Sequence, residues 1–378
     1  LTANRTENIT LKENARLGEV VVMGDLNSPL IHTQTGKRSL NVRDIKTEFS
    51  LLSSPDVVKT LQRSSGVSEG IELMSGLYVH GGSNDENLFL IDGTPLYQVN
   101  HSLGLFSSFN SDMIKNVDFY KSGFPARYGG RLSSVIDVRT RDGDFNHFHG
   151  SFRIGLLDGS LQFDGPIRKG RTSYNIGLRR SWLDLLTRPL FAIHNKKNAK
   201  DEDDITFNYF FHDFNAKVTN IFSDRSRLSL SVYSGEDRIH TKDELKDDDI
   251  NETELNEFNM NWGNLNAALN WEYVFSPKLF ANFTAVYTHN VSKYKFLYDQ
   301  RVVSRWGPHA GETSVTYMEY GYRSTIDDLG YRLAFDYRPS PRHHIRFGQD
   351  YTFHMFHPQT RQHKNYYGTG TAVDSLDR

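Results

Sequence analysis

Residues 265–288, LNAALNWEYVFSPKLFANFTAVYT, decide the fold of this chain. Leu269 and Trp271 fall on one side of a two-residue repeat, whereas Asn270 falls on the other. Two is the period of a β-strand, whose successive side chains point to opposite faces. The turn at residues 276–278 then reverses the chain into a second segment with the same alternation. The stretch therefore predicts an antiparallel hairpin with one apolar and one polar face.

The same alternation recurs along residues 146–378 and predicts about nine strands there. Short turns follow alternate strands, and long polar segments follow the others. Short turns at one end and long loops at the other are typical of an outer-membrane β-barrel, whose apolar face meets lipid and whose polar face lines the lumen. A large soluble β-sandwich also alternates and remains the alternative. The expected turns are 168–171, 223–226, 276–278 and 339–342, and the expected loops are 184–204, 240–257, 298–312 and the stretch from 361.

The composition excludes several other classes of protein. Lys and Arg total 44 against 46 Asp and Glu, so the basic excess of a nucleic-acid-binding domain is missing. The chain has no cysteine for disulfides or thiol zinc sites, and no run of about 18 apolar residues for a membrane-spanning helix. Aromatic residues nevertheless make up 13% of the chain. Such an excess suits strands whose outer side chains meet lipid and form aromatic girdles.

Residues 1–145 predict a small α+β domain instead. Ser54-Pro55-Asp56 is interpreted as a helix start, with a hydroxyl N-cap, proline at the first helical position and an acid in the first turn. Gly66 supplies the stop. Short apolar runs at 77–79, 87–91 and 135–138, separated by turns such as Asp92-Gly93, predict strands.

Three motifs of this domain resemble TonB-dependent outer-membrane receptors. SPDVVKTLQ (54–62) is similar to the early helix of the family's plug, and FPARYGGR (124–131) is similar to the approach to its final strand. LYVHGG (77–82) with NLFLIDGTPLY (87–97) looks like the central hairpin of the plug. The family often has arginine where His80 stands. In the family's order, the three motifs followed by amphipathic strands imply a plugged barrel in the outer membrane of a Gram-negative bacterium.

The resemblance divides the chain into three parts. Residues 1–24 would be the end of an N-terminal extension and a segment like the Ton box, residues 25–145 the plug, and residues 146–378 the N-terminal part of the transmembrane barrel. A plugged transporter has about 22 strands, and an open sheet would leave unpaired edges in lipid. We therefore expect the chain to be the plug and first part of a larger receptor.

LGEVVVMG (17–24) resembles the Ton box that such receptors offer to TonB, the energy-transducing partner in the inner membrane. A β-branched extended run can add as an edge strand to a partner sheet, which predicts TonB binding by Glu19, Val20, Val21, Val22 and Met23. An ordinary edge strand is the alternative. ITLKENAR (9–16) looks like the tail of an N-terminal extension found on many members of the family from Bacteroidota. The plug hairpin lacks the long glycine-serine insert that is typical of the family's SusC branch, so we expect a receptor outside that branch.

Two groups of plug residues are candidate functional residues. Arg127 and Arg131 are predicted to couple plug and barrel through lumen acids such as Glu272 or Asp336, because a buried charge needs a partner. The expected ligand is a small molecule, a glycan or a peptide, and a surface lipoprotein is a further candidate partner. The predicted ligand-binding residues are His80, Asn84, Tyr97, His101 and Phe106.

The sequence gives no basis for an enzyme. It has no H-E-x-x-H, nucleophile-elbow or phosphate-loop pattern, so no catalytic residue, metal ligand or cofactor is predicted. The acidic runs 201–204 and 247–249 lack the spacing of a calcium loop and are interpreted as solvated loop charges. Import of a scarce solute is the function that the resemblance implies. A surface assembly or adhesion protein that uses the same scaffold without transport is the second hypothesis.

Overall fold

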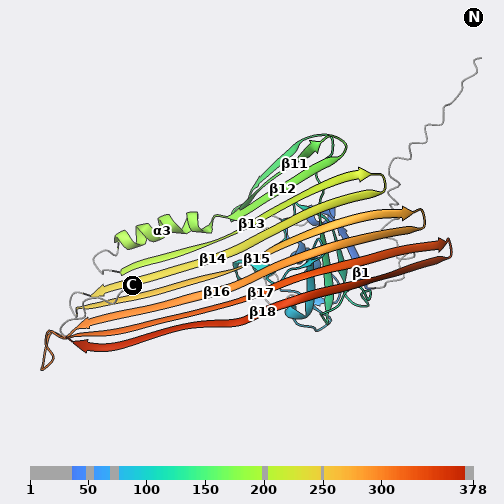
Figure 1. The fold of residues 1–378 in the computed structure, drawn as a ribbon. Helices are drawn as coiled ribbons and strands as arrows, with labels where there is room; N and C mark the ends of the chain where they lie inside the picture. Colours follow the sequence, from blue (N-terminus) through green and yellow to red (C-terminus); the bar gives the residue numbers. More distant parts are fainter. Residues whose placement is uncertain (1–35, 48–54, 69–75, 198–202, 248–250, 371–378) are drawn as a thin grey trace, which may run out of the picture. The chain divides into compact units, whose positions relative to one another are not determined.

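The structure is a computed structural model that describes residues 36–47, 55–68, 76–197, 203–247 and 251–370 (Figure 1). No helix in these ranges is long and apolar enough to cross a membrane. A domain of short helices and strands precedes one antiparallel sheet of nine strands, the last six of which are long. The predicted fold class and strand number are therefore confirmed.

The N-terminal domain is built around a five-stranded sheet in the order β1-β8-β9-β4-β5. Its core is apolar, and Tyr233 of the long sheet packs into it. Its elements are β1 (Lys37–Asn41), α1 (Val42–Lys46), α2 (Val57–Gln62), β2 (Val67–Ser68), β3 (Tyr78–Val79), η1 (Asn84–Glu86), β4 (Asn87–Ile91), β5 (Thr94–Pro95), β6 (Asn100–His101), η2 (Ser102–Gly104), β7 (Phe106–Ser107), β8 (Ile114–Tyr120) and β9 (Ser134–Thr140).

Two local predictions for this domain need correction. The N-cap of α2 is Asp56, because its side chain accepts hydrogen bonds from the backbone N–H groups of Val58 and Lys59. The predicted hydroxyl N-cap at Ser54 is therefore two residues too early. The central hairpin is β4–β5, which turns at Gly93 with φ +88°, whereas β3 pairs with β2. An acid reaches two orphan helix donors as well as a hydroxyl does, and glycine adopts this positive φ without strain.

The long sheet runs in chain order, each strand antiparallel to the next. Figure 1 shows its later strands as a run of long neighbouring arrows. The strands are β10 (His149–Ile154), β11 (Asp158–Arg168), β12 (Thr172–Ser181), β13 (Asp203–Ser223), β14 (Ser226–Asp247), β15 (Glu252–Ser276), β16 (Leu279–Val303), β17 (Thr313–Ser340) and β18 (His343–Gly370), with helix α3 (Leu183–Lys197) between β12 and β13.

The predicted short turns agree with these bounds, but the predicted long loops do not. Residues 240–247 and 252–257 belong to β14 and β15, residues 298–303 belong to β16, and residues 361–370 belong to β18. These stretches looked like loops because they are polar. Crossing lipid takes roughly 9–11 residues of a strand, whereas β17 and β18 have 28 residues each. The strands therefore continue well beyond the membrane.

The two faces of the long sheet differ as the alternation predicted. Leu269 is 44% exposed, whereas Asn266 is 2% exposed because the N-terminal domain covers it. We call the face that carries Asn266 the inner face and the face that carries Leu269 the outer face. Aromatic rings pair on the outer face near the short turns. The ring centroids of Trp271 and Phe283 are 5.4 Å apart, and those of Phe335 and Phe347 are 5.0 Å apart. A row of aromatic rings there is what a membrane-interface girdle requires.

Helix α3 covers an open edge of the sheet, next to β13 in Figure 1. The pairing of β12 with β13 ends at His212, so β13 has no strand on that side at residues 205–208. The Asn195 side chain accepts from the backbone N–H of Ile205 and donates to its carbonyl oxygen, and Thr187 donates to the carbonyl of Phe207. These side chains satisfy backbone groups that an edge strand would otherwise leave unpaired.

Candidate functional site

Strand β5 and the loop after it are joined to the inner face of the long sheet by amide side chains. Asn266 donates to the carbonyl oxygen of Pro95 at 2.7 Å, and Asn264 donates to that of Gln98 at 2.7 Å. Both asparagines come from β15, on the polar side of the predicted alternation. The polar face of the wall therefore binds the backbone of the domain directly.

A buried cluster of charges lies at the next residues of this loop. The His101 ring binds a carboxylate at each nitrogen, Asp237 at 2.5 Å from Nδ1 and Asp213 at 2.9 Å from Nε2. Arg179 donates to Asp213 at 2.7 Å and to the carbonyl oxygen of Ser107 at 2.5 Å. His101, Arg179, Asp213 and Asp237 are each no more than 3% exposed. We call these four residues the His101 cluster.

The His101 cluster is electrically balanced only when the histidine is charged. Both ring nitrogens can donate to carboxylates only in the imidazolium form, which together with Arg179 balances Asp213 and Asp237. Burial alone would lower the pKa of His101, but the two carboxylates outweigh burial and raise this pKa to about 9. The ring also stacks on Phe211, with centroids 4.3 Å apart. The histidine is thus held as a cation inside the interface.

The raised pKa of His101 predicts that the domain is held less firmly in alkali. The folded-state pKa of about 9 exceeds the ordinary value of 6.5, so the stabilisation is complete below about pH 6.5 and is lost as the pH rises through about 9. The loss by pH 10 should reach about 3 kcal/mol. The measurement is the pH dependence of the thermal midpoint of the full receptor in detergent. His101→Gln should remove this dependence, and an equal slope in both proteins would contradict the assignment.

Further contacts tie the domain to the sheet on both sides of the cluster. Tyr97 donates to Asp328 at 2.6 Å, and burial, followed by this carboxylate, raises the pKa of Tyr97. At the first two strands of the long sheet, Asp112 binds Arg153 of β10 and the Ser160 hydroxyl of β11, each at 2.9 Å. Arg227 of β14 reaches Asp142 at 2.5 Å. The anchoring is therefore spread over several strands, and the His101 cluster is its most buried part.

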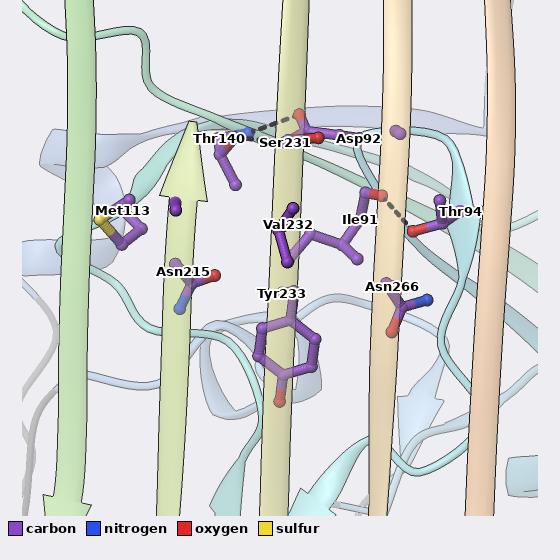
Figure 2. Close-up of a pocket in the computed structure, with 12 residues that line it drawn as sticks. Ile91, Asp92, Thr94, Met113, Thr140, Asn215, Ser231, Val232, Tyr233 and Asn266 are labelled. Carbon is purple, nitrogen blue, oxygen red and sulfur yellow. Dashed lines mark hydrogen bonds between the residues drawn. The ribbon is translucent and has the colours of Figure 1, made fainter. Parts of the chain in front are cut away.

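A small cavity remains between the domain and the sheet. Figure 2 shows Ile91, Asp92 and Thr140 on the domain side, facing Asn215 and Asn266 on the sheet side. The Asn215 amide nitrogen and the Asn266 amide oxygen are buried and have no hydrogen-bond partner there. The space is about the size of one water molecule. It is too small for a nutrient, so this cavity is not a ligand site.

The structure separates the predicted ligand-binding residues into two groups. Tyr97, His101 and Phe106 contact the sheet, and His101 and Phe106 are buried. His80 lies exposed at φ +49°, and Asn84 accepts a hydrogen bond from the backbone N–H of Leu77. In this structure, therefore, three of the predicted ligand residues form the contact between domain and wall. Binding of a solute by these residues stays a prediction.

The arginines predicted to couple plug and barrel make their contacts within the domain. Arg127 donates to the hydroxyls of Tyr120 and Tyr128, and Arg131 donates to the carbonyl oxygen of Gly130. The predicted partner Asp336 is bound by His344 and Arg346 near a turn of the sheet. In this structure the arginines do not pair with Asp336, and their predicted coupling of plug and barrel stays a prediction. Tyr128, which donates to Asp137, provides a local partner that the prediction overlooked.

The residues that do join the two parts were missed, although one signal for them was present. Asp213, Asp237 and Asp328 are acids on the polar side of strands whose neighbours there are mostly uncharged. A lone charge on a lumen face needs a partner of opposite sign or a hydrogen-bond donor.

Within the described ranges, no group of three or more His, Asp or Glu residues could hold a metal ion.

A small domain docked on the polar inner face of an antiparallel sheet, whose outer face is apolar with an aromatic row, defines a plugged outer-membrane barrel wall. The family described as TonB-dependent Receptor Plug Domain matches residues 38–135. Residues 38–135 therefore carry a TonB-dependent receptor plug domain, which places the chain in the outer membrane of a Gram-negative bacterium. We now call residues 36–145 the plug. No curated protein matches the chain.

Several solved structures are similar to parts of this chain. The ferric enterobactin receptor PfeA from Pseudomonas aeruginosa is 12% identical to this chain, with a TM-score of 0.41. The match covers 85% of this chain and 58% of the PfeA chain. The outer membrane transporter YddB from Escherichia coli is 11% identical with a TM-score of 0.47, covering 88% and 58%. The FrpB iron transporter from Neisseria meningitidis is 11% identical with a TM-score of 0.39, covering 84% and 65%. The chain thus spans less than two thirds of these three proteins.

Proposed function

We propose that this chain is the plug and first part of the wall of a transporter that imports a scarce solute across the outer membrane, with energy supplied through TonB. The observation that carries this proposal is the docking of the plug on the lumen face through the buried, balanced His101 cluster. A plug held in this way obstructs the lumen, so passage of a solute requires work to displace it. A passive anchor has no need of such an obstruction.

The segment Glu19–Met23, proposed to contact TonB, lies outside the described residues. Its β-branched sequence suits addition to the edge of a partner sheet, in which main-chain hydrogen bonds supply the affinity. Binding of the solute outside would have to change the availability of this segment inside, which is a coupling between two sites. The plug contacts at Tyr97 and His101 are candidates for that coupling, in place of the predicted Arg127 and Arg131.

The other proposed partners follow from the two faces of the wall. Membrane lipid meets the outer face, and the solute enters from the outer side over the plug. A small molecule, a glycan or a peptide fits this class of receptor, and a surface lipoprotein that covers the entrance remains a prediction. No observation on the described residues favours the surface assembly or adhesion hypothesis over import.

Capture by TonB tests the proposal. The full receptor in detergent should bind a purified TonB C-terminal domain, and deletion of Glu19–Met23 should abolish this binding, because the deletion removes the strand that would pair with TonB. Deletion of the five residues Thr10–Asn14 serves as a control of equal length and should leave binding unchanged. Equal binding by the intact receptor and the Glu19–Met23 deletion would contradict the proposed TonB segment, and no binding by the intact receptor would contradict TonB-driven import.

A further inference from the structure

A groove lies between two neighbouring short turns of the long sheet, the turn at 276–278 and the turn at 339–342. Its volume is about 590 Å³. Lys278, Arg338, His343 and His344 line it, together with two prolines and a serine. No acid is among the lining residues, so the polar side chains that face the groove are bases and one hydroxyl. We call this space the turn groove.

The main chain and one side-chain contact hold the turn groove in shape. The backbone N–H of Arg338 donates to the carbonyl oxygen of Lys278 at 2.7 Å, which joins the two turns. Within the second turn, the Ser340 hydroxyl lies 2.8 Å from Nδ1 of His343. The prolines on both sides of Ser340 each fix a backbone φ at about −65°. The groove is therefore part of the folded wall and needs no ligand to form it.

The bases at the turn groove exceed the acid beside them. Asp336 accepts hydrogen bonds from Arg338 at 3.3 Å and from Arg346 at 3.1 Å, and it lies 2.7 Å from Nε2 of His344. One carboxylate neutralises only one of the two guanidinium groups, so positive charge is left over. Lys278 is exposed and makes no ion pair with the described residues. An excess of positive charge along a groove favours an anionic ligand.

The other short turns carry the same sign of charge. Within the turns 168–171, 223–226, 276–278 and 339–342, the bases are Arg168, Lys169, Arg171, Arg225, Lys278 and Arg342, and the acid is Asp224. Because the short turns of an outer-membrane barrel face the periplasm, the periplasmic end of this wall is positively charged along its length. Clusters of bases at a membrane surface attract the headgroups of anionic lipids.

Apolar side chains border the turn groove on the outer face of the sheet. Leu279, Tyr337 and Ile345 form one row of cross-strand partners there, and each is next in sequence to a base that lines the groove. Tyr337 and Ile345 are 38% and 47% exposed. Two residues further along their strands, the rings of Phe335 and Phe347 stack on each other. The basic groove is therefore continuous with the lipid-facing surface.

We propose that the turn groove binds the phosphate headgroup of an anionic phospholipid from the periplasmic leaflet, while an acyl chain lies along Leu279, Tyr337 and Ile345. Lysine and arginine form charge-assisted hydrogen bonds with phosphate oxygens. A phospholipid carries a phosphate and an apolar chain in one molecule, and the wall offers a surface for each of them side by side. A peptidoglycan fragment would supply carboxylates for the groove but nothing for the apolar row. This inference goes beyond the proposed function, because lipid binding at the turns does not depend on import.

Native mass spectrometry of the full receptor, released from detergent, tests the turn groove. The probe is dioleoylphosphatidylglycerol, and dioleoylphosphatidylcholine is the comparison lipid without net charge. The receptor should bind the anionic lipid more tightly. The double variant Lys278→Gln/Arg338→Gln should weaken its Kd about tenfold, because two cationic donors to phosphate are removed. Lys278→Gln alone breaks no ion pair within the described residues and should weaken the Kd in the same direction.

The matched control is Lys293→Gln/Arg323→Gln. These two exposed bases are cross-strand partners on the outer face, far from the short turns, so the control removes the same charge elsewhere. It should leave the Kd for the anionic lipid within about twofold. Heat-modifiable mobility on denaturing gels verifies that each variant is folded.

Four results would overturn the proposal. The first is equal affinity for the two lipids, and the second is an equal loss of affinity in the groove variant and the control. The third is that glycerophosphoglycerol, the same headgroup without acyl chains, binds as tightly as the lipid, which would show a phosphate site and not a lipid site. The fourth is that a muramyl pentapeptide binds and only the groove variant loses this binding, which would assign the groove to peptidoglycan.

Discussion

Asp213→Ala is expected to weaken the docking of the plug by about 3–5 kcal/mol, the cost of removing one partner from a buried ion pair. Asp213 is fully buried and accepts hydrogen bonds from His101, Arg179 and Tyr233. Without it, His101 is left with the carboxylate of Asp237 alone, and Arg179 loses the carboxylate to which it donates in a buried site. The variant should therefore behave as a receptor whose plug is released at a lower denaturant concentration.

A cysteine reporter measures this effect, because the chain has no cysteine of its own. Ser107 is buried at the cluster, and its hydroxyl has no partner, so Ser107→Cys gives a thiol that maleimide reaches only after undocking. Its labelling is followed against urea in the full receptor. Asp350→Ala, which breaks the exposed pair with Arg332, is the control and should cost at most about 1 kcal/mol. Equal shifts for both variants would show that the His101 cluster does not hold the plug.

Leu269→Arg is expected to destabilise the receptor in lipid by about 2–4 kcal/mol, because it places a charge near the middle of the membrane on the lipid-facing side. Leu269 is exposed on the outer face, opposite Leu230 and Ala285 on its two neighbouring strands. The measurement is the denaturant midpoint of the full receptor in lipid vesicles.

The matched control for this change is Leu255→Arg. Leu255 lies on the outer face of β15 like Leu269, fourteen residues further from the short turn at 276–278. Its cross-strand neighbours are Glu244 on β14 and Asp299 on β16. An arginine there meets water and two acids, so its cost should be close to zero. If both arginines cost the same, the outer face does not meet lipid at Leu269, and the soluble β-sandwich alternative would return.

The parts of the fold that depend on local patterns were predictable from the sequence. Alternation around Leu269 identified the strands, and turns such as 276–278 fixed their order. The outer ends of the strands were not predictable in the same way, because residues 240–257 are polar and looked like a loop. Strand pairing there is satisfied by backbone hydrogen bonds and does not require an apolar face.

Only the plug side of the contact between plug and sheet was predictable from the sequence. The plug motifs led to Tyr97 and His101 as special residues, but their partners Asp328 and Asp213 lie 231 and 112 residues away along the chain. Such pairs depend on how the plug is rotated against the sheet, which a single sequence does not encode in any local pattern. The contacts of Arg127 were hidden for the complementary reason, since this arginine donates to two tyrosines of its own domain.

The edge position of β1 in the plug sheet has a mechanical consequence. The described chain enters at Gly36, directly before β1, so tension transmitted from residues upstream would load β1 first. Five residue pairs with β8 and the Lys37–Asp118 ion pair hold this strand. If they broke, β8, β9, β4 and β5 would remain paired with one another. A pulling force could therefore detach β1 while the other four strands stay paired, and such a partial opening would need less work than extraction of the whole plug.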